Sequence, residues 1–68
     1  MPYATLDDLP PRVRSHLPVH AQEIWRATFN AAWDRHRDDP RREEIAPRIA
    51  WAAVKRRYRR VGEEWLPL

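Results

Sequence analysis

Residues 20–37 constrain this chain most, because they form an amphipathic helical pattern with an unusually wide apolar face. At about 100° per residue, this face covers roughly 200°, about twice the apolar stripe of an ordinary surface helix. It holds Ala21, Ile24, Trp25, Thr28, Phe29, Ala32 and Trp33. The remaining arc holds Glu23, Arg26, Asn30, Asp34 and Arg37. The pattern therefore predicts a central helix that the rest of the chain covers on more than one side.

The size of the chain limits how large its core can be. A length of 68 residues predicts one domain, covering residues 1–68, with a core of marginal size. The sequence has no cysteine, which excludes a disulfide framework and a thiolate metal site. Four Trp, two Tyr and one Phe supply large blocks of buried area instead. We therefore expect a compact all-α domain that folds without a metal ion.

Two prolines frame a short helix before the central one. Pro11 suits the first helical position, and the helix is expected to run over residues 11–17. Val13 and Leu17 lie one turn apart and form its inner face. Pro18 ends this helix and opens the next, so the two helices must meet at a sharp angle.

A third helix is predicted over roughly residues 40–61, with Asp39 as a plausible N-cap. Pro47 leaves its start open, since a helix from Pro40 is kinked there and a start near Ala46 leaves residues 40–45 as a loop. We favour a weak first turn followed by a firm helix after Pro47. Gly62 then occupies the position after the helix end. The expected inner stripe is Ala50, Trp51, Val54, Tyr58 and Val61.

A basic surface is the strongest functional feature. The net charge is +3, and residues 41–68 carry eight Lys and Arg against four Glu. On the helical wheel one exposed strip forms outside the apolar stripe: Arg48, Lys55, Arg56, Arg59 and Arg60. Such a strip suits phosphate groups or an acidic protein surface. It is equally compatible with a solvated face whose charges pair with Glu43, Glu44, Glu63 and Glu64.

Other features argue against metal and catalytic chemistry. The acidic turn around Asp38 and Asp39 has neither the EF-hand spacing nor its glycine, and arginines interrupt it, so helix capping and pairing such as Glu44 with Arg48 are preferred. The three histidines share no metal-ligand spacing, and no serine or threonine lies in a triad or phosphate-loop context. We expect no enzyme activity, no cofactor and no metal. Five aromatic and two aliphatic side chains are interpreted as structural core: Ile24, Trp25, Phe29, Trp33, Trp51, Val54 and Tyr58.

The sequence resembles the ChaB family nearly from end to end. The matching pieces are the opening MPY, Asp8-Leu9-Pro10, Leu17-Pro18, His20-Ala-Gln, Phe29-Asn, Ala32-Trp33, Arg42-Glu-Glu, Ala50-Trp-Ala-Ala-Val-Lys, Tyr58 and Trp65. The resemblance implies three helices with a minimal two-stranded sheet that joins the terminal segments around Tyr3 and Trp65. It also implies a regulator of a calcium/sodium–proton antiporter, while viral relatives are described as DNA-binding proteins.

These observations together predict a small, non-enzymatic binding module. No apolar run is long enough to span a membrane and no signal peptide is recognisable, so the expected location is cytoplasmic. The expected partner is an acidic protein or the antiporter. The alternative is a nucleic-acid-binding accessory protein that uses the basic face of the third helix, with weak contacts to phosphates. The sequence leaves the oligomeric state open.

Overall fold

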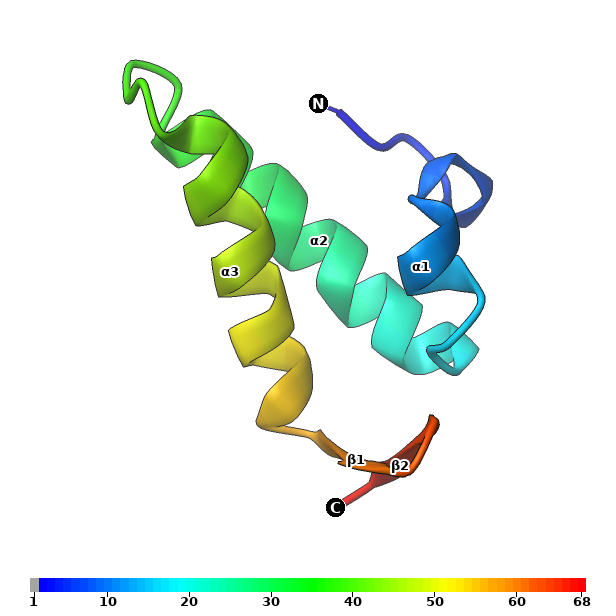
Figure 1. Ribbon diagram of the computed structural model, residues 1–68. Coiled ribbons are helices and arrows are strands. Elements are labelled where there is room, and N and C mark those ends of the chain that lie inside the picture. Colours follow the sequence, from blue (N-terminus) through cyan, green and yellow to red (C-terminus); the bar gives the residue numbers. More distant parts are fainter. Residues whose placement is uncertain (1) are drawn as a thin grey trace.

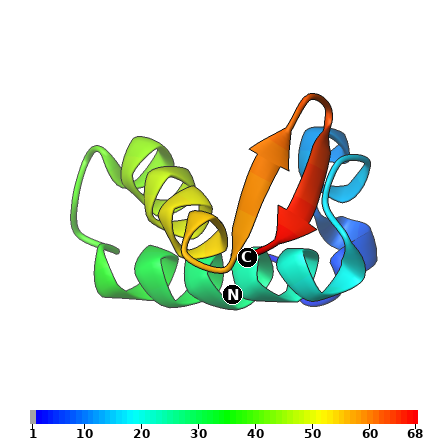
Figure 2. The same cartoon turned by 90° about the horizontal axis from the view of Figure 1, so that it is seen from below.

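The computed structural model describes residues 2–68, and Met1, the first residue of the expected domain, lies outside them. The element order is a 3₁₀ turn η1 (Leu6–Asp8), then α1 (Pro11–Arg14), α2 (Val19–Arg35), α3 (Arg42–Lys55), β1 (Tyr58–Val61) and β2 (Glu64–Pro67). Helix α2 forms a base, with α3 and α1 against different parts of it (Figure 1). The view from below shows the β-hairpin between α3 and α1, above α2 (Figure 2).

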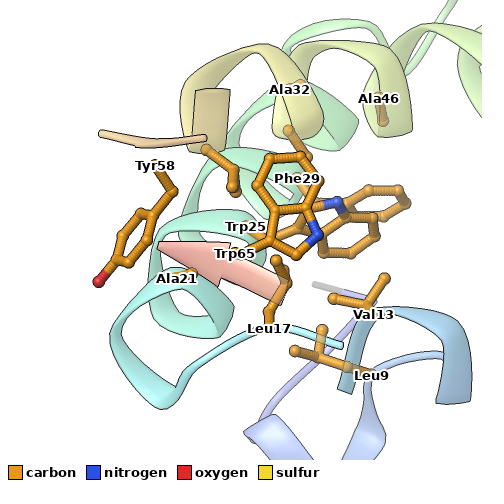
Figure 3. Packing of buried hydrophobic residues seen from close by; sticks show 12 residues of the cluster. Leu9, Val13, Leu17, Ala21, Trp25, Phe29, Ala32, Ala46, Tyr58 and Trp65 are labelled. Carbon is orange, nitrogen blue, oxygen red and sulfur yellow. The ribbon is translucent and has the colours of Figure 1, made fainter. Parts of the chain in front are cut away.

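The central helix α2 uses its wide apolar face as predicted. It begins one residue earlier than expected and ends at Arg35, where the N–H of His36 donates to the Ala32 carbonyl at 3.0 Å. Trp25 stacks on Phe29, and Phe29 in turn stacks on Trp33, with ring centroids 4.9 and 5.7 Å apart. The main cluster gathers side chains from every α-helix and from both strands (Figure 3).

The polar side of α2 differs from the prediction at Asn30. This side chain was placed on the solvent-facing arc, yet it is only 7% exposed. Its Oδ1 accepts from the Tyr3 N–H at 3.3 Å, and its Nδ2 donates to the Tyr3 carbonyl at 2.8 Å. Gln22 is similarly buried and its Nε2 donates to the carbonyls of Leu17 and Arg14. The side-chain amides of Asn30 and Gln22 therefore form hydrogen bonds to the backbone of segments that precede α2 in the chain.

Helix α1 starts at Pro11 as expected but ends at Arg14, three residues before the predicted end. The chain continues as a turn, in which the Leu17 N–H donates to the Val13 carbonyl at 3.2 Å. Val13 and Leu17 are both buried, as predicted for the inner face. The shortening changes the helix boundary and leaves the packing face intact.

Helix α3 begins at Arg42 and continues through Pro47, so the predicted start at Pro40 and the weak turn before Pro47 are wrong. Proline lacks an N–H, which removes the hydrogen bond that the Glu43 carbonyl would receive inside the helix. Glu43 is exposed, so water can satisfy that carbonyl. The turn before the helix is instead stabilised by Asp39, whose Oδ1 accepts from the Arg41 N–H at 2.8 Å.

The predicted third helix is also too long, because residues 58–61 form strand β1 rather than a helical end. β1 pairs antiparallel with β2, with Tyr58 opposite Pro67 and Arg60 opposite Trp65. Gly62 has a φ of +63° and opens a two-residue loop, which favours a hairpin turn that glycine adopts easily. Tyr58 and Trp65 are buried, whereas Val61, expected on the inner stripe, is 49% exposed.

The two-stranded sheet is confirmed, but it does not join the two terminal segments. Both of its strands come from the C-terminal third of the chain. The backbone of Tyr3 bonds to the Asn30 amide instead, and the Tyr3 ring packs on Phe29 with centroids 5.0 Å apart. These contacts, rather than pairing with a strand, hold the N-terminal segment on α2.

Candidate functional site

All five residues of the predicted basic strip are exposed, but they do not form one helical strip. Arg48 and Lys55 lie on α3, and Arg56 immediately follows its end. Arg59 and Arg60 lie on β1, where successive side chains point to opposite faces of the hairpin. The change from helix to strand after Lys55 therefore divides the predicted surface.

Lys55 and Arg60 are brought together in a groove of about 450 Å³. We call it the basic groove and define it by its lining residues, which are Arg12, His16, Trp51, Lys55, Arg60 and Trp65. Arg12 and His16 come from α1 and the turn after it, far away in the sequence. Neither residue was predicted, because only the packing of the α1 segment beside the hairpin brings them to Lys55 and Arg60.

The other cations of the strip lie elsewhere. Arg56 and Arg57 line a second hollow of about 350 Å³, together with His20, Ile24 and Ala53. Arg59 shares the outward face of the hairpin with Val61, Glu64 and Leu66, because β-strand side chains alternate between faces. Of the five predicted residues, the structure thus unites only Lys55 and Arg60 in one hollow.

The alternative of a solvated face predicts ion pairs between the basic strip and nearby glutamates, and no such pair occurs in the part of the chain that the structure describes. Among residues 2–68 the close contacts between basic and acidic side chains are His20 with Glu23 at 3.7 Å and Arg41 with Glu44 at 3.0 Å. The Arg60 Nε instead donates to the Gly62 carbonyl at 2.9 Å. The basic side chains therefore present their charge to solvent.

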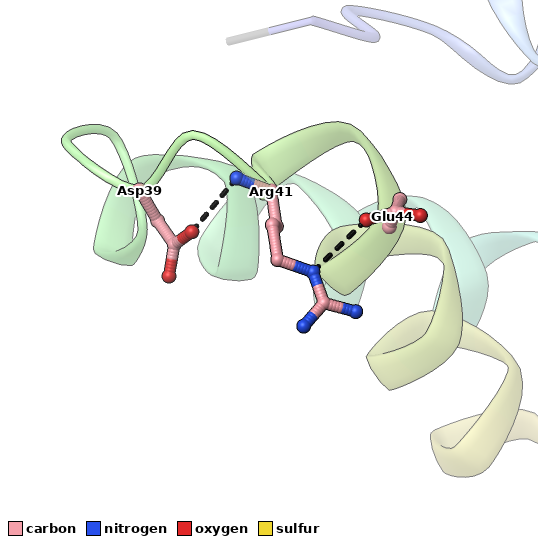
Figure 4. Close-up of polar contacts among 3 residues, drawn as sticks. All are labelled: Asp39, Arg41 and Glu44. Atoms are coloured by element: carbon pink, nitrogen blue, oxygen red, sulfur yellow. Dashed lines mark hydrogen bonds and ion pairs between the residues drawn. The ribbon is translucent and has the colours of Figure 1, made fainter.

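The acidic turn between α2 and α3 is occupied by its own arginines (Figure 4). Asp39 accepts from the backbone of Arg41, and the Arg41 Nε donates to Glu44 Oε2 at 3.0 Å, so Glu44 pairs with Arg41 rather than with Arg48 as predicted. Within the described part of the chain, no three His, Cys, Asp or Glu side chains are grouped as metal ligands. These contacts stabilise the turn before α3; the N-cap residue is Arg41 rather than the predicted Asp39, and no side chain among residues 2–68 caps the helix start.

The predicted core residues divide into two groups by burial. Trp25, Phe29, Val54 and Tyr58 are buried. Ile24, Trp33 and Trp51 are half-buried and pack against the cluster. The half-buried group includes Trp51, which lines the basic groove together with the buried Trp65.

The model of the ChaB family matches residues 9–67 of this chain. The chain belongs to the ChaB family. The "putative cation transport regulator ChaB" proteins of Escherichia coli K12 and Shigella flexneri are each 52% identical to it over 64 residues. The match covers 85% of this chain and 84% of either relative. Its homologues are thus named as cation transport regulators.

The ChaB fold is matched as well as the ChaB sequence. The solution NMR structure of a ChaB protein has a TM-score of 0.86 and 44% sequence identity, covering 98% of this chain and 99% of the other. This likeness confirms three helices with a small two-stranded antiparallel sheet. Across residues 2–68, no helix combines the length and the apolar character that a bilayer span requires.

Proposed function

We propose that this chain is a non-enzymatic binding module that regulates a calcium/sodium–proton antiporter by docking on its cytoplasmic, acidic surface. One observation carries this proposal: five cations lie within residues 55–60, all of them exposed. They are Lys55, Arg56, Arg57, Arg59 and Arg60. None of them is ion-paired within residues 2–68. Positive charge attracts an acidic partner and orients its approach, even though these cations are divided between the end of α3 and the two faces of the hairpin.

The outer face of the hairpin supports docking rather than simple solvation. Val61 and Leu66 are 49% and 38% exposed, and Arg59 lies directly opposite Leu66 in the register. Arginine beside exposed apolar side chains is typical of protein interfaces, where charge gives specificity and apolar area gives affinity. The name of the relatives, "putative cation transport regulator ChaB", supports a transporter as the class of partner.

Two hydroxyl groups that could act as nucleophiles are engaged in local structure, which supports a non-enzymatic role. Ser15 Oγ donates to the Pro11 carbonyl at 2.6 Å. Thr5 Oγ1 lies 3.1 Å from Asp8 Oδ2, which also accepts from the Thr5 N–H. Both side chains stabilise turns of the N-terminal segment.

The experiment is calcium- or sodium-driven proton exchange in everted membrane vesicles that contain such an antiporter. We expect the purified protein to change the exchange rate saturably, and Arg56→Glu combined with Arg59→Glu to abolish the change. Arg35→Glu combined with Arg37→Glu is the matched control, because it reverses two exposed charges near the C-terminal end of α2, outside residues 55–60. The proposal fails if the wild-type protein neither alters exchange nor sediments with antiporter vesicles more than with antiporter-free vesicles.

The same exposed cations favour nucleic-acid binding as the second candidate function. Contacts would be to phosphates, weak and steeply dependent on salt. The variant Lys55→Glu with Arg59→Glu tests this by fluorescence anisotropy on duplex DNA at low and at physiological salt. Tight binding at physiological salt that the variant abolishes would replace the transporter proposal. Absence of binding even at low salt would eliminate this candidate.

A further inference from the structure

The basic groove joins three parts of the chain that are distant in sequence. Arg12 and His16 approach it from the α1 segment, Lys55 from the last residue of α3, and Arg60 from β1. Its volume of about 450 Å³ lies within the range of small-molecule sites, about 300–1,000 Å³. The groove is thus large enough for a small ligand and is distinct from the outward face of the hairpin.

Buried neighbours fix the positions from which these side chains extend. Val13 follows Arg12 and Val54 precedes Lys55, and both valines are fully buried. Arg60 lies opposite the buried Trp65 in the sheet register. The backbone under each cation is therefore held by the core before any ligand arrives, which lowers the cost of ordering a site.

The tryptophans of the groove are also held rigidly. Trp51 stacks on Trp65 with ring centroids 5.7 Å apart and an interplanar angle of 28°. Its other contact is edge-on to Trp25, at 6.1 Å and 72°. These two rings form an apolar wall beside the cations, which themselves stay exposed to solvent.

The charge of the groove is uncompensated. Its lining contains three permanent cations, Arg12, Lys55 and Arg60, with the imidazole of His16 beside them and no acidic residue. None of these four side chains has an ion-pair partner within residues 2–68. Arg60 uses its Nε on the Gly62 carbonyl, which leaves its two terminal nitrogens free to donate. Like charges gathered around one hollow are relieved by an anion that carries several negative charges.

We propose that the basic groove binds a small phosphorylated anion with at least two negative charges. Guanidinium groups bind phosphate oxygens bidentately, and an ammonium group adds a point charge that phosphate tolerates from many directions. The anion could be free inorganic polyphosphate or the phosphate chain of a nucleotide, which share this chemistry. This inference goes beyond the proposed transporter docking, since it concerns the isolated chain and a different ligand.

The test is a titration of the full-length protein followed by ¹H–¹⁵N NMR, including the indole N–H signals. The probes are sodium tripolyphosphate, ATP and adenosine, with ionic strength matched by NaCl. We expect saturable shifts at Trp51, Trp65 and Arg60 with both phosphorylated probes. Equal affinities identify the phosphate chain as the ligand group, and tighter ATP binding adds a contribution from the base. Shifts with adenosine alone, unsaturable shifts spread over all the cations, or no shifts would overturn the proposal.

Matched variants separate the groove from the general positive charge of the protein. Arg12→Gln with Arg60→Gln removes two groove cations, and Arg35→Gln with Arg37→Gln removes two exposed cations outside it. Since charge-assisted hydrogen bonds are stronger than neutral ones, the first pair should weaken tripolyphosphate binding by about tenfold or more, and the second by less than about twofold. Lys55→Gln serves as the second groove variant if the first pair alters the spectrum of the free protein. Equal losses in the groove and control variants would overturn the proposal. Because no transporter is present, this result is independent of the docking experiment.

Discussion

At the scale of single residues, Asn30 connects the N-terminal segment to the central helix. Replacing it with Ala leaves the Tyr3 N–H without its amide acceptor in a partly buried place, while the Tyr3 carbonyl keeps only the longer bond of 3.3 Å from the Arg26 Nη1. We expect Asn30→Ala to lower the free energy of unfolding by about 1–3 kcal/mol, the cost of unsatisfied buried polar groups. Urea denaturation measures the loss. Asp34→Ala, on the exposed face of α2, is the control and should cost under about 0.5 kcal/mol. Similar losses in both variants would contradict this role.

Asn30 also shows what a hydropathy pattern cannot predict. Periodicity correctly placed Trp25 and Phe29 inside, because apolar area alone drives their burial. It placed Asn30 outside, because a helical wheel contains no information on a backbone segment arriving from elsewhere with a free N–H and carbonyl. A buried amide is recognised only when its hydrogen-bond partner is known.

At the scale of elements, the β-hairpin depends on the conformation of Gly62. Its φ of +63° is unfavourable for residues with a side chain, whereas a methyl group at this position would meet no other atom within 4 Å. Gly62→Ala should therefore destabilise the protein through the backbone alone, by about 1–2 kcal/mol. Thermal denaturation monitored by circular dichroism measures this, with Glu63→Ala as the neighbouring control. An unchanged melting temperature for Gly62→Ala would show that the hairpin tolerates another turn.

Strand β1 of the hairpin is the element that was predicted as helix, whereas the segment around Trp65 was predicted as a strand. Tyr58 lies four residues after Val54, which fits a helical face, and Tyr58 is indeed buried. The same residue also fits the inward face of a strand, so periodicity could not separate the two states over so short a segment. The distinguishing signal was Gly62-Glu63 between two four-residue segments, a length typical of a two-residue hairpin loop.

The turn between α2 and α3 gives a third prediction. Two of its carboxylates are engaged by Arg41: Asp39 accepts from the Arg41 N–H, and Glu44 pairs with the Arg41 side chain. Calcium needs six to eight oxygen ligands, and neutralised carboxylates supply few. We expect a calcium titration followed by NMR to produce no localised, saturable shifts between Asp38 and Glu44 at micromolar metal. Saturable shifts confined to this turn would contradict the interpretation, and magnesium titration distinguishes calcium affinity from general ionic effects.

At the scale of the whole molecule, the candidate site could be predicted only in part. The charge excess of the last third was visible in the sequence, and Lys55 and Arg60 do lie in the basic groove. The contributions of Arg12 and His16 follow from how α1 and the hairpin pack together on α2, a tertiary relation that no local spacing contains. The number of charged residues can therefore be read from the sequence, whereas the fold determines which of them line the same groove.

The stability of the molecule as a whole should depend most on Trp25. A protein of this size has an unfolding free energy of roughly 3–10 kcal/mol, by the usual stability per residue. Trp25 is 1% exposed and contacts the rings of Phe29, Tyr3 and Trp51, so truncation to Ala should cost about 3–5 kcal/mol. That loss is comparable to the total, and we expect Trp25→Ala to be largely unfolded at 37 °C.

Trp33 provides the comparison, because it is half-buried and lies at the far end of the same stack of rings. The Arg42 guanidinium lies 3.8 Å from the centre of its ring, so Trp33→Ala also removes a cation–π contact. We expect this variant to remain folded with a loss on the order of 1–2 kcal/mol, since solvent already covers part of the ring. Guanidinium chloride denaturation of both variants measures the difference. Equal losses would mean that burial at Trp25 does not dominate the core, and that the stack of aromatic rings on α2 acts as one unit.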